Sequence, residues 1–146
     1  MDERDIESAL LTKLQELVPD YLKLVDSFSG GLAEAVDRLV AYAPALLLKF
    51  ASRKETLVNR GAQLYLCEPV FILIFCVSAI QGSADAKDSA LLLAEKIAEK
   101  ILGSDLDLEI EPFSSDGIEL IEAKEDKEFW GLNLSAKFIL KKELSE

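Results

Sequence analysis

The chain has no histidine and only small numbers of several other chemically distinctive residues. Its 146 residues include two cysteines, one tryptophan and one methionine. Without histidine, it lacks the side chain that most often serves as a general base or metal ligand near neutral pH. Two cysteines are too few for a disulfide scaffold. Cys67 and Cys76 lie within or beside an apolar stretch, so we expect both to be inert thiols in the core.

Positive charge is also scarce. Sixteen lysines and arginines face 27 aspartates and glutamates, which leaves a net charge of -11. Nucleic-acid binding needs clustered cations that displace counterions, so specific nucleic-acid binding is not expected. No glycine-rich phosphate loop opens a helix.

Membrane and export signals are missing as well. The longest apolar run, Pro69 to Ile80, is shorter than the roughly 20 residues of a spanning helix, and its β-branched and aromatic content predicts a buried strand. The charged start, Met1 to Asp5, does not resemble a secretory signal. We therefore expect a cytoplasmic protein with no membrane segment.

The length fits one domain, residues 1–146, and half of the residues are hydrophobic, as in a globular protein. Apolar residues at helical spacing predict three helices, with a Gly103 stop after the third. The predicted helices are Glu3 to Val18, Leu32 to about Tyr42, and Ala86 to Leu102. Tyr21 to Val25 is predicted to be a strand or an irregular continuation.

Strand patterns occupy much of the remaining chain. The predicted strands are Pro44 to Phe50, Ala62 to Ile80 with a bulge or break at Glu68-Pro69, Asp105 to Glu111, Ile118 to Ala123, and Trp130 to Leu140. The polar residues Ser52 to Glu55 predict a loop, and Asn59-Arg60-Gly61 a turn. The central strand–helix–strand run, 70–111, is typical of a βαβ-type unit. The predicted fold is α/β (α+β), with a mixed, mainly antiparallel β-sheet packed against two or three α-helices.

Several landmarks occur in a characteristic order. They are an N-terminal helix, Pro-Ala-Leu-Leu-Leu-Lys-Phe at 44–50, Asn-Arg-Gly at 59–61, a long apolar strand, Lys-Ile-Leu-Gly at 100–103 and Trp-Gly-Leu-Asn-Leu at 130–134. Over nearly the whole chain this pattern resembles the Mu-like prophage tail protein family. Residues 21–42 depart from it, since a strand and a turn would be expected where the sequence predicts a helix.

The resemblance implies a tail-terminator-like fold and a structural role. Similar proteins cap the tail tube of contractile phages or related headless bacteriocin particles as a ring, usually sixfold, which stops tube growth and connects to the next component. The implied partners are copies of the chain itself, the tail tube protein and, beyond these, the sheath protein and a head–tail connector. The protein would assemble in the host cytoplasm and then enter the virion or tail-like particle. No enzymatic activity, cofactor or metal is expected. The alternative is a cytoplasmic tail-assembly chaperone or adaptor that is not retained in the particle.

Two charged segments could serve such a role. Nine acidic residues lie between Asp105 and Asp126, against Lys124 alone. Asp105, Asp107, Glu109 and Glu111 are either a solvated sheet face or the lining of a channel that repels DNA phosphates. Arg53, Lys54 and Arg60 are either an ordinary exposed loop or a contact with an adjacent subunit or the tube.

Other interpretations have less support. Glu119 and Glu122 could form an acid–base pair, but the sequence shows neither a pocket nor a shifted pKa. The alternating acids from Asp105 lack the glycine and spacing of a helix-loop-helix calcium site. Trp130 and Phe129 could anchor an interface, although the alternating strand favours core packing for Trp130.

Overall fold

The computed structural model describes residues 3–78, 83–106, 108, 110–124 and 126–141. In chain order the elements are α1 (Glu3–Leu14), a short 3-10 helix η1 (Gln15–Leu17), β1 (Leu24–Ser27), α2 (Leu32–Tyr42), β2 (Ala45–Asn59), β3 (Leu64–Ser78), α3 (Ser83–Ile101), β4 (Ile118–Lys124), β5 (Lys127–Ser135) and β6 (Phe138–Lys141). Within the described ranges, no helix is both long and apolar enough to cross a bilayer.

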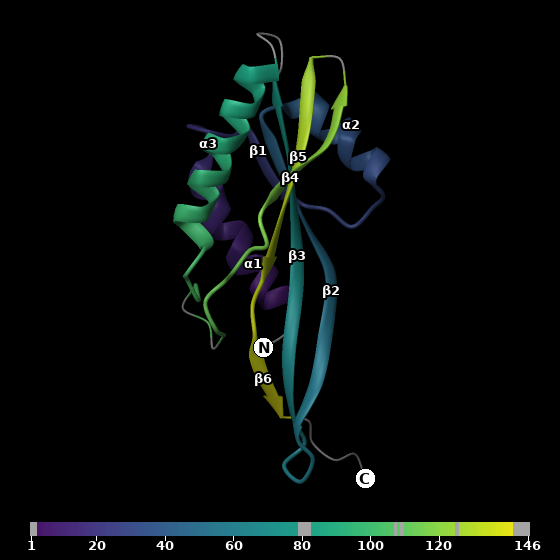
Figure 1. Cartoon of the computed structure of the whole chain (residues 1–146), viewed down its shortest axis with the longest axis vertical. Coiled ribbons are helices and arrows are strands. Elements are labelled where there is room, and N and C mark those ends of the chain that lie inside the picture. Colours follow the sequence, from purple (N-terminus) through teal and green to yellow (C-terminus); the bar gives the residue numbers. More distant parts are fainter. Residues whose placement is uncertain (1–2, 79–82, 107, 109, 125, 142–146) are drawn as a thin grey trace.

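The described strands form one sheet in the order β1-β2-β3-β5-β4, and β6 pairs with β3 beyond the end of β5. The pair β1–β2 is parallel, while the other pairs are antiparallel. The sheet is therefore mixed and mainly antiparallel, and it packs against helices, which confirms the predicted fold class (Figure 1).

One face of the sheet packs against α1 and α3, which lie on the same side of the strands (Figure 1). Side chains at helical spacing, such as Ile6 and Leu10 of α1 and Ala90 and Ile97 of α3, are fully buried there. They meet alternate residues of the strands, whose side chains point to the same face. The strand residues in this core include Leu46, Leu48, Phe71, Leu73, Phe75, Leu132 and Leu134.

The opposite face is covered by α2 over part of its length only. Ala35, Val36 and Leu39 of α2 pack against the intervening strand residues, including Leu47, Ile74, Cys76 and Phe129. Because both faces of β3 are buried at this level, the strand is apolar at every position from Val70 to Val77, as the sequence predicted. Both cysteines are fully buried.

The predicted helices are confirmed with small changes at their ends. The first ends in η1, the second runs from Leu32 to Tyr42 as predicted, and the third starts slightly earlier than expected. Gly103 follows α3 with φ +75°, a left-handed conformation that favours glycine. The short first strand is β1, which begins at Leu24.

The predicted strand from Asp105 to Glu111 is wrong. Asp107 and Glu109 lie outside the described residues, and the described residues of this segment lie in turns and bends. Leu106 has φ +54°, and the Leu108 amide donates to the Asp105 carbonyl at 2.9 Å. Leu106, Leu108 and Ile110 pack against the core from this irregular segment, which explains the apolar alternation without a strand. The predicted βαβ-type run 70–111 therefore lacks its second strand; the next strand, β4, runs parallel to β3 but is separated from it by β5.

The predicted loop at Ser52 to Glu55 is also wrong, since these residues continue β2. Hydrogen bonding to β3 keeps them extended, despite their polar composition, because their pairing partners are supplied by the tertiary fold. The register shifts between Phe50 and Ser52, so Ala51 forms a bulge.

The last predicted strand, Trp130 to Leu140, is two strands. β3 runs through Glu68-Pro69 without a break, and the interruption falls opposite, between Ser135 and Phe138. Pro69 has no N–H to donate to its neighbour, which accounts for the gap in the ladder. Trp130 is half-buried against the α1–α3 core and Phe129 is fully buried on the α2 face. Core packing, the interpretation favoured for Trp130, is thus confirmed.

Candidate functional site

The strands β2 and β3 extend well past the helices as a hairpin (Figure 1). We call this extension the arm: residues 52–59 of β2, the turn 60–63, residues 64–68 of β3, and β6, which pairs with β3 from Leu64 to Cys67. The rest of the chain is the body. The Ala51 bulge and Pro69 lie at the junction. At about 3.3 Å per residue, eight strand residues project roughly 25 Å.

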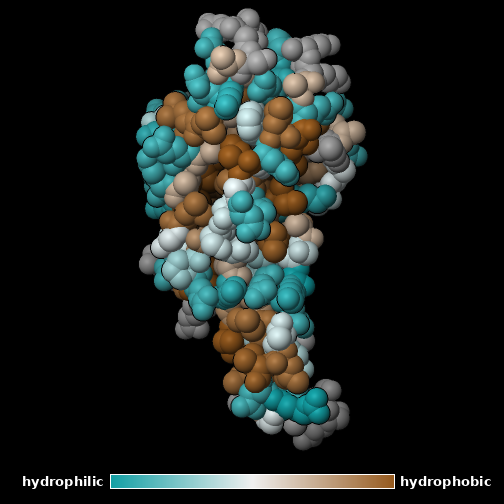
Figure 2. Space-filling view, in the orientation of Figure 1, coloured by the Kyte–Doolittle hydropathy of each residue, from teal (hydrophilic) through white to brown (hydrophobic). Residues whose placement is uncertain are grey.

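Apolar side chains remain exposed on the arm. Val58 is 59% exposed, Ile139 56% and Leu57 39%, and Leu64, Leu66 and Leu140 are half-buried. Figure 2 shows apolar side chains gathered on the arm, in the lower part of the view. Scattered exposed hydrophobics are ordinary, but a cluster on a projecting hairpin is typical of a surface that another protein covers.

Arg53 lies inside the arm. Its guanidinium donates to Glu55 Oε1 at 2.6 Å and lies 3.4 Å from Cys67 Sγ. The guanidinium carbon is 5.8 Å from the centre of the Phe138 ring, a cation–π distance. Arg53 thus ties β2, β3 and β6 together, and its predicted place in a mobile polar loop is wrong.

Lys54 and Arg60 differ from Arg53 because both are exposed. Neither side chain has an ion-pair partner among the residues that the structure describes. Glu68 lies opposite Lys54 in the register but pairs with Lys137, at 3.8 Å between Nζ and Oε1. The three predicted contact residues therefore do not form one patch: Arg53 holds the arm together, while Lys54 and Arg60 place positive charge on its surface.

The predicted acidic face is not a strand face. Asp105 and Glu111 are exposed on the irregular segment after α3, and Asp107 and Glu109 lie outside the described residues. The Glu111 amide donates to the Lys137 carbonyl at 2.7 Å, which holds this segment beside the base of the arm. The channel hypothesis stays a prediction, but its basis in an alternating strand is lost.

A second acidic surface lies at the far edge of the sheet, on β4. Glu119 and Glu122 are exposed and have no ion-pair partner within the described ranges, and Asp116, just before β4, is also exposed. Asp116 accepts a hydrogen bond from Asn133 Nδ2 at 3.3 Å. Of the strands described, only β5 pairs with β4, so one backbone edge of β4 is open.

A hollow of about 490 Å³ lies beside β4, lined by apolar side chains such as Ile72 and Ile121 and by Glu119. A β-bulge at Ile121 brings that side chain over Gly131, where an added Cβ would lie 2.8 Å from Ile121 Cδ1. Gly131 therefore makes room for Ile121. The result is a hollow whose lining combines apolar side chains with the acidic residues Asp116 and Glu119.

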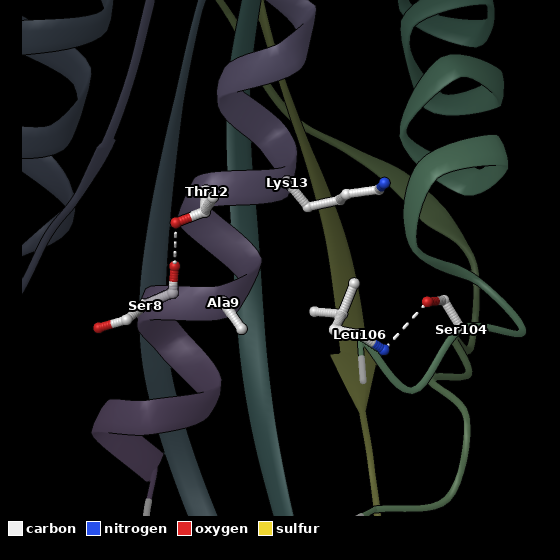
Figure 3. Close-up of a pocket in the computed structure, with 6 residues that line it drawn as sticks. All are labelled: Ser8, Ala9, Thr12, Lys13, Ser104 and Leu106. Carbon is white, nitrogen blue, oxygen red and sulfur yellow. Dashed lines mark hydrogen bonds between the residues drawn. The ribbon is translucent and has the colours of Figure 1, made fainter. Parts of the chain in front are cut away.

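The other hollows are less distinctive. A pocket of about 370 Å³ lies between α1 and the segment after α3 (Figure 3). Its lining has one charged side chain, Lys13, which pairs with Glu16 at 3.3 Å. Thr12 donates to the Ser8 carbonyl and the Leu106 amide to Ser104 Oγ, so these polar groups satisfy one another. Within the described part of the chain, no group of three potential metal ligands is found.

Two ionisable side chains in the body, Asp26 and Cys76, have shifted pKa values. The guanidinium of Arg38 on α2 donates to Asp26 of β1 and lowers the pKa of that carboxyl, and it also reaches the Ser27 carbonyl. Burial raises the pKa of the Cys76 thiol to about 11. A thiol with so high a pKa is protonated and unreactive at neutral pH. The Arg38–Asp26 pair therefore stabilises the fold, and Cys76 packs in the core as an unreactive side chain.

Residues 4–136 match the family model described as Bacteriophage Mu, Gp37. The chain belongs to this family. The match covers most of the chain and confirms the resemblance to Mu-like phage proteins. No curated protein matches the sequence. Among solved structures, the chain is similar to one in the virion of a native gene transfer agent particle, at 14% identity and a TM-score of 0.49, over 90% of this chain and 92% of that one. That similarity is too low to transfer a role.

The sequence did not reveal the apolar residues of the arm or the hollow beside β4. Leu57, Val58 and Ile139 fit ordinary strand patterns, and nothing in their spacing separates an exposed position from a core position. The arm would have been found only by extending the predicted strands Pro44 to Phe50 and Ala62 to Ile80 toward Asn59-Arg60-Gly61, and the polar residues Ser52 to Glu55 argued against that extension.

Proposed function

We propose that this protein is a structural component of a phage tail or tail-like particle. In this proposal, copies of the chain form a ring, expected to be sixfold, on the end of the tail tube. The ring stops polymerisation of the tube and connects it to the next component. The role requires no catalytic chemistry, and we propose that the protein is not an enzyme.

Membership of the Bacteriophage Mu, Gp37 family supports a role in a phage particle. The observation that carries a role in assembly is the arm. Beyond the packed body it presents exposed apolar side chains and two cations, Lys54 and Arg60, which have no ion-pair partner among the described residues. A projecting hairpin of this kind gains stability when another subunit covers it. The open edge of β4 supplies a second surface for contacts between proteins.

The experiment that tests the proposal is to locate the protein in purified particles. We would tag one end of the chain, purify intact particles, and label them with gold-conjugated antibody for electron microscopy. Label at one end of the tail tube, in about constant amount per particle, is expected. Abundant protein in the lysate with none in purified particles would contradict the proposal and support the assembly chaperone or adaptor.

A further inference from the structure

We propose that the arm of one copy binds the acidic β4 surface of the next copy, and that this head-to-tail contact builds the ring. The β4 surface comprises Asp116, Glu119, Glu122 and the hollow lined by Ile72 and Ile121. The inference rests on the proposed ring and names the two surfaces that contact each other in it. Each surface binds a second copy of this chain.

Charge complementarity is the first argument. The chain has a net charge of -11, so two copies repel each other unless local charges oppose that repulsion. Lys54 and Arg60 place unpaired cations on the arm, whereas Glu119 and Glu122 place unpaired acids on β4, in the described part of the chain. A contact between these surfaces brings opposite charges together and directs the orientation of the two copies.

Apolar complementarity is the second argument. The arm exposes Val58 and Ile139, and the β4 surface contains a hollow of about 490 Å³ whose lining includes apolar side chains such as Ile72 and Ile121. Inserting projecting apolar side chains into such a hollow removes both from water. The acidic residues of the lining, Asp116 and Glu119, would pair with the cations of the arm beside these apolar contacts, and protein interfaces typically combine apolar and polar contacts in this way.

The geometry excludes the same contact within one chain. Leu64 starts the arm side of β3, and Leu73 is level with Leu132 and, through it, with Ile118 of β4. Nine residues of extended strand separate the turn end of the arm from this level of β4 by roughly 30 Å. Lys54, opposite Glu68, lies five residues from that level, roughly 16 Å along the strand, and it is also three strands away from β4 across the sheet. Because the two surfaces differ, the contact is heterologous, and repetition of a heterologous contact produces a closed ring or a filament.

Cysteine cross-linking tests the contact in assembled particles. The double variant Arg60→Cys with Glu119→Cys places one thiol on each surface, too far apart to join within a chain. Native Cys67 and Cys76 are buried and serve as an internal background. After oxidation of lysates that contain assembled particles, non-reducing gels should show a ladder of covalent multimers. Each single variant should stay monomeric, and a mixture of the two single variants should give dimers and nothing larger.

A charge exchange provides an independent readout. Lys54→Glu with Arg60→Glu should abolish rings, and adding Glu119→Lys with Glu122→Lys should restore them. The matched control restores the same net charge elsewhere: adding Glu34→Lys with Asp37→Lys, two exposed acids of α2, to Lys54→Glu with Arg60→Glu should leave rings absent. Recovery of rings would show that the two surfaces meet, because neither pair of changes alone restores the attraction.

The possible failures are distinguishable. Dimers from Arg60→Cys alone would show that two arms contact each other. Cross-links to the tube protein would show that the arm binds the tube. Either result would overturn the inference but would not contradict the proposed ring. Rings seen by electron microscopy without any cross-linked ladder would do the same. If the unmodified protein forms no ring, either free or on tubes, the proposed function itself fails, and the inference fails with it.

Discussion

Replacing Val58 and Ile139 together by threonine should weaken ring assembly without weakening the folded subunit. Threonine keeps the β-branched shape that suits a strand but adds a hydroxyl that resists burial. Complete burial of valine or isoleucine is worth about 1.5–3 kcal/mol, and more than half of each side chain is still exposed in the single chain, at 59% and 56%. Each contact should therefore lose about 1 kcal/mol per residue. The two changes together cost about 2 kcal/mol, or about 30-fold in affinity per contact.

Sedimentation velocity over a concentration series measures the loss, and urea unfolding of the subunit provides the stability control. Leu91→Gln is the matched control, because Leu91 is 44% exposed but lies on α3 rather than on the arm. The protein concentration at which half of the chains are in rings should rise for the arm variant and not for Leu91→Gln. The urea concentration at the unfolding midpoint of both variants should stay close to that of the parent. Equal ring midpoints for the parent and the arm variant would refute the reasoning.

Three further predictions concern the subunit itself. Phe71→Ala removes a fully buried ring that meets Phe50 edge-on at 5.7 Å, and it should lower the free energy of unfolding by about 3–5 kcal/mol, measured in urea. Arg38 lowers the pKa of Asp26 in the folded state, so the ion pair stabilises the fold fully above the pKa that the carboxyl has in the unfolded chain. This stabilisation is lost as the pH falls through the pKa of Asp26 in the folded chain. Arg38→Met should therefore lower the free energy of unfolding by at most about 1 kcal/mol at pH 7, and the difference from the parent should vanish in acid. Cys67 and Cys76 should not react with a thiol reagent at pH 8 in the folded chain and should react in denaturant, and fast labelling without denaturant would contradict their burial.

Much of the fold was predictable because its signals are strong and local. Helical spacing identified all three helices, and the run from Val70 to Val77 identified a strand buried on both faces. The strand predicted for Asp105 to Glu111 was wrong because alternation of apolar and polar residues shows which side chains face the core but does not require an extended backbone. Ser52 to Glu55 failed because their extended conformation depends on β3, which lies elsewhere in the sequence.

The candidate site was less predictable than the fold. The sequence grouped Arg53 with Lys54 and Arg60, and Arg53 could not be separated from them without its distances to Glu55, Cys67 and Phe138. The hollow beside β4 depends on the Ile121 bulge and on Gly131, which come together only in the sheet. Whether an apolar side chain is exposed depends on the whole fold, so the sequence pattern alone could not show that the apolar residues of the arm are exposed.

We propose that this protein ends the tail tube, and the lengths of tails from a strain lacking its gene give the sharpest test of that role. Electron micrographs of the deletion strain and its parent give the two length distributions and the fraction of tails joined to the next component. A terminator should leave overlong tubes, or finished tails that lack that component, in the deletion strain, and complementation should restore the parent's tails. Tails of normal length with normal attachment would contradict it.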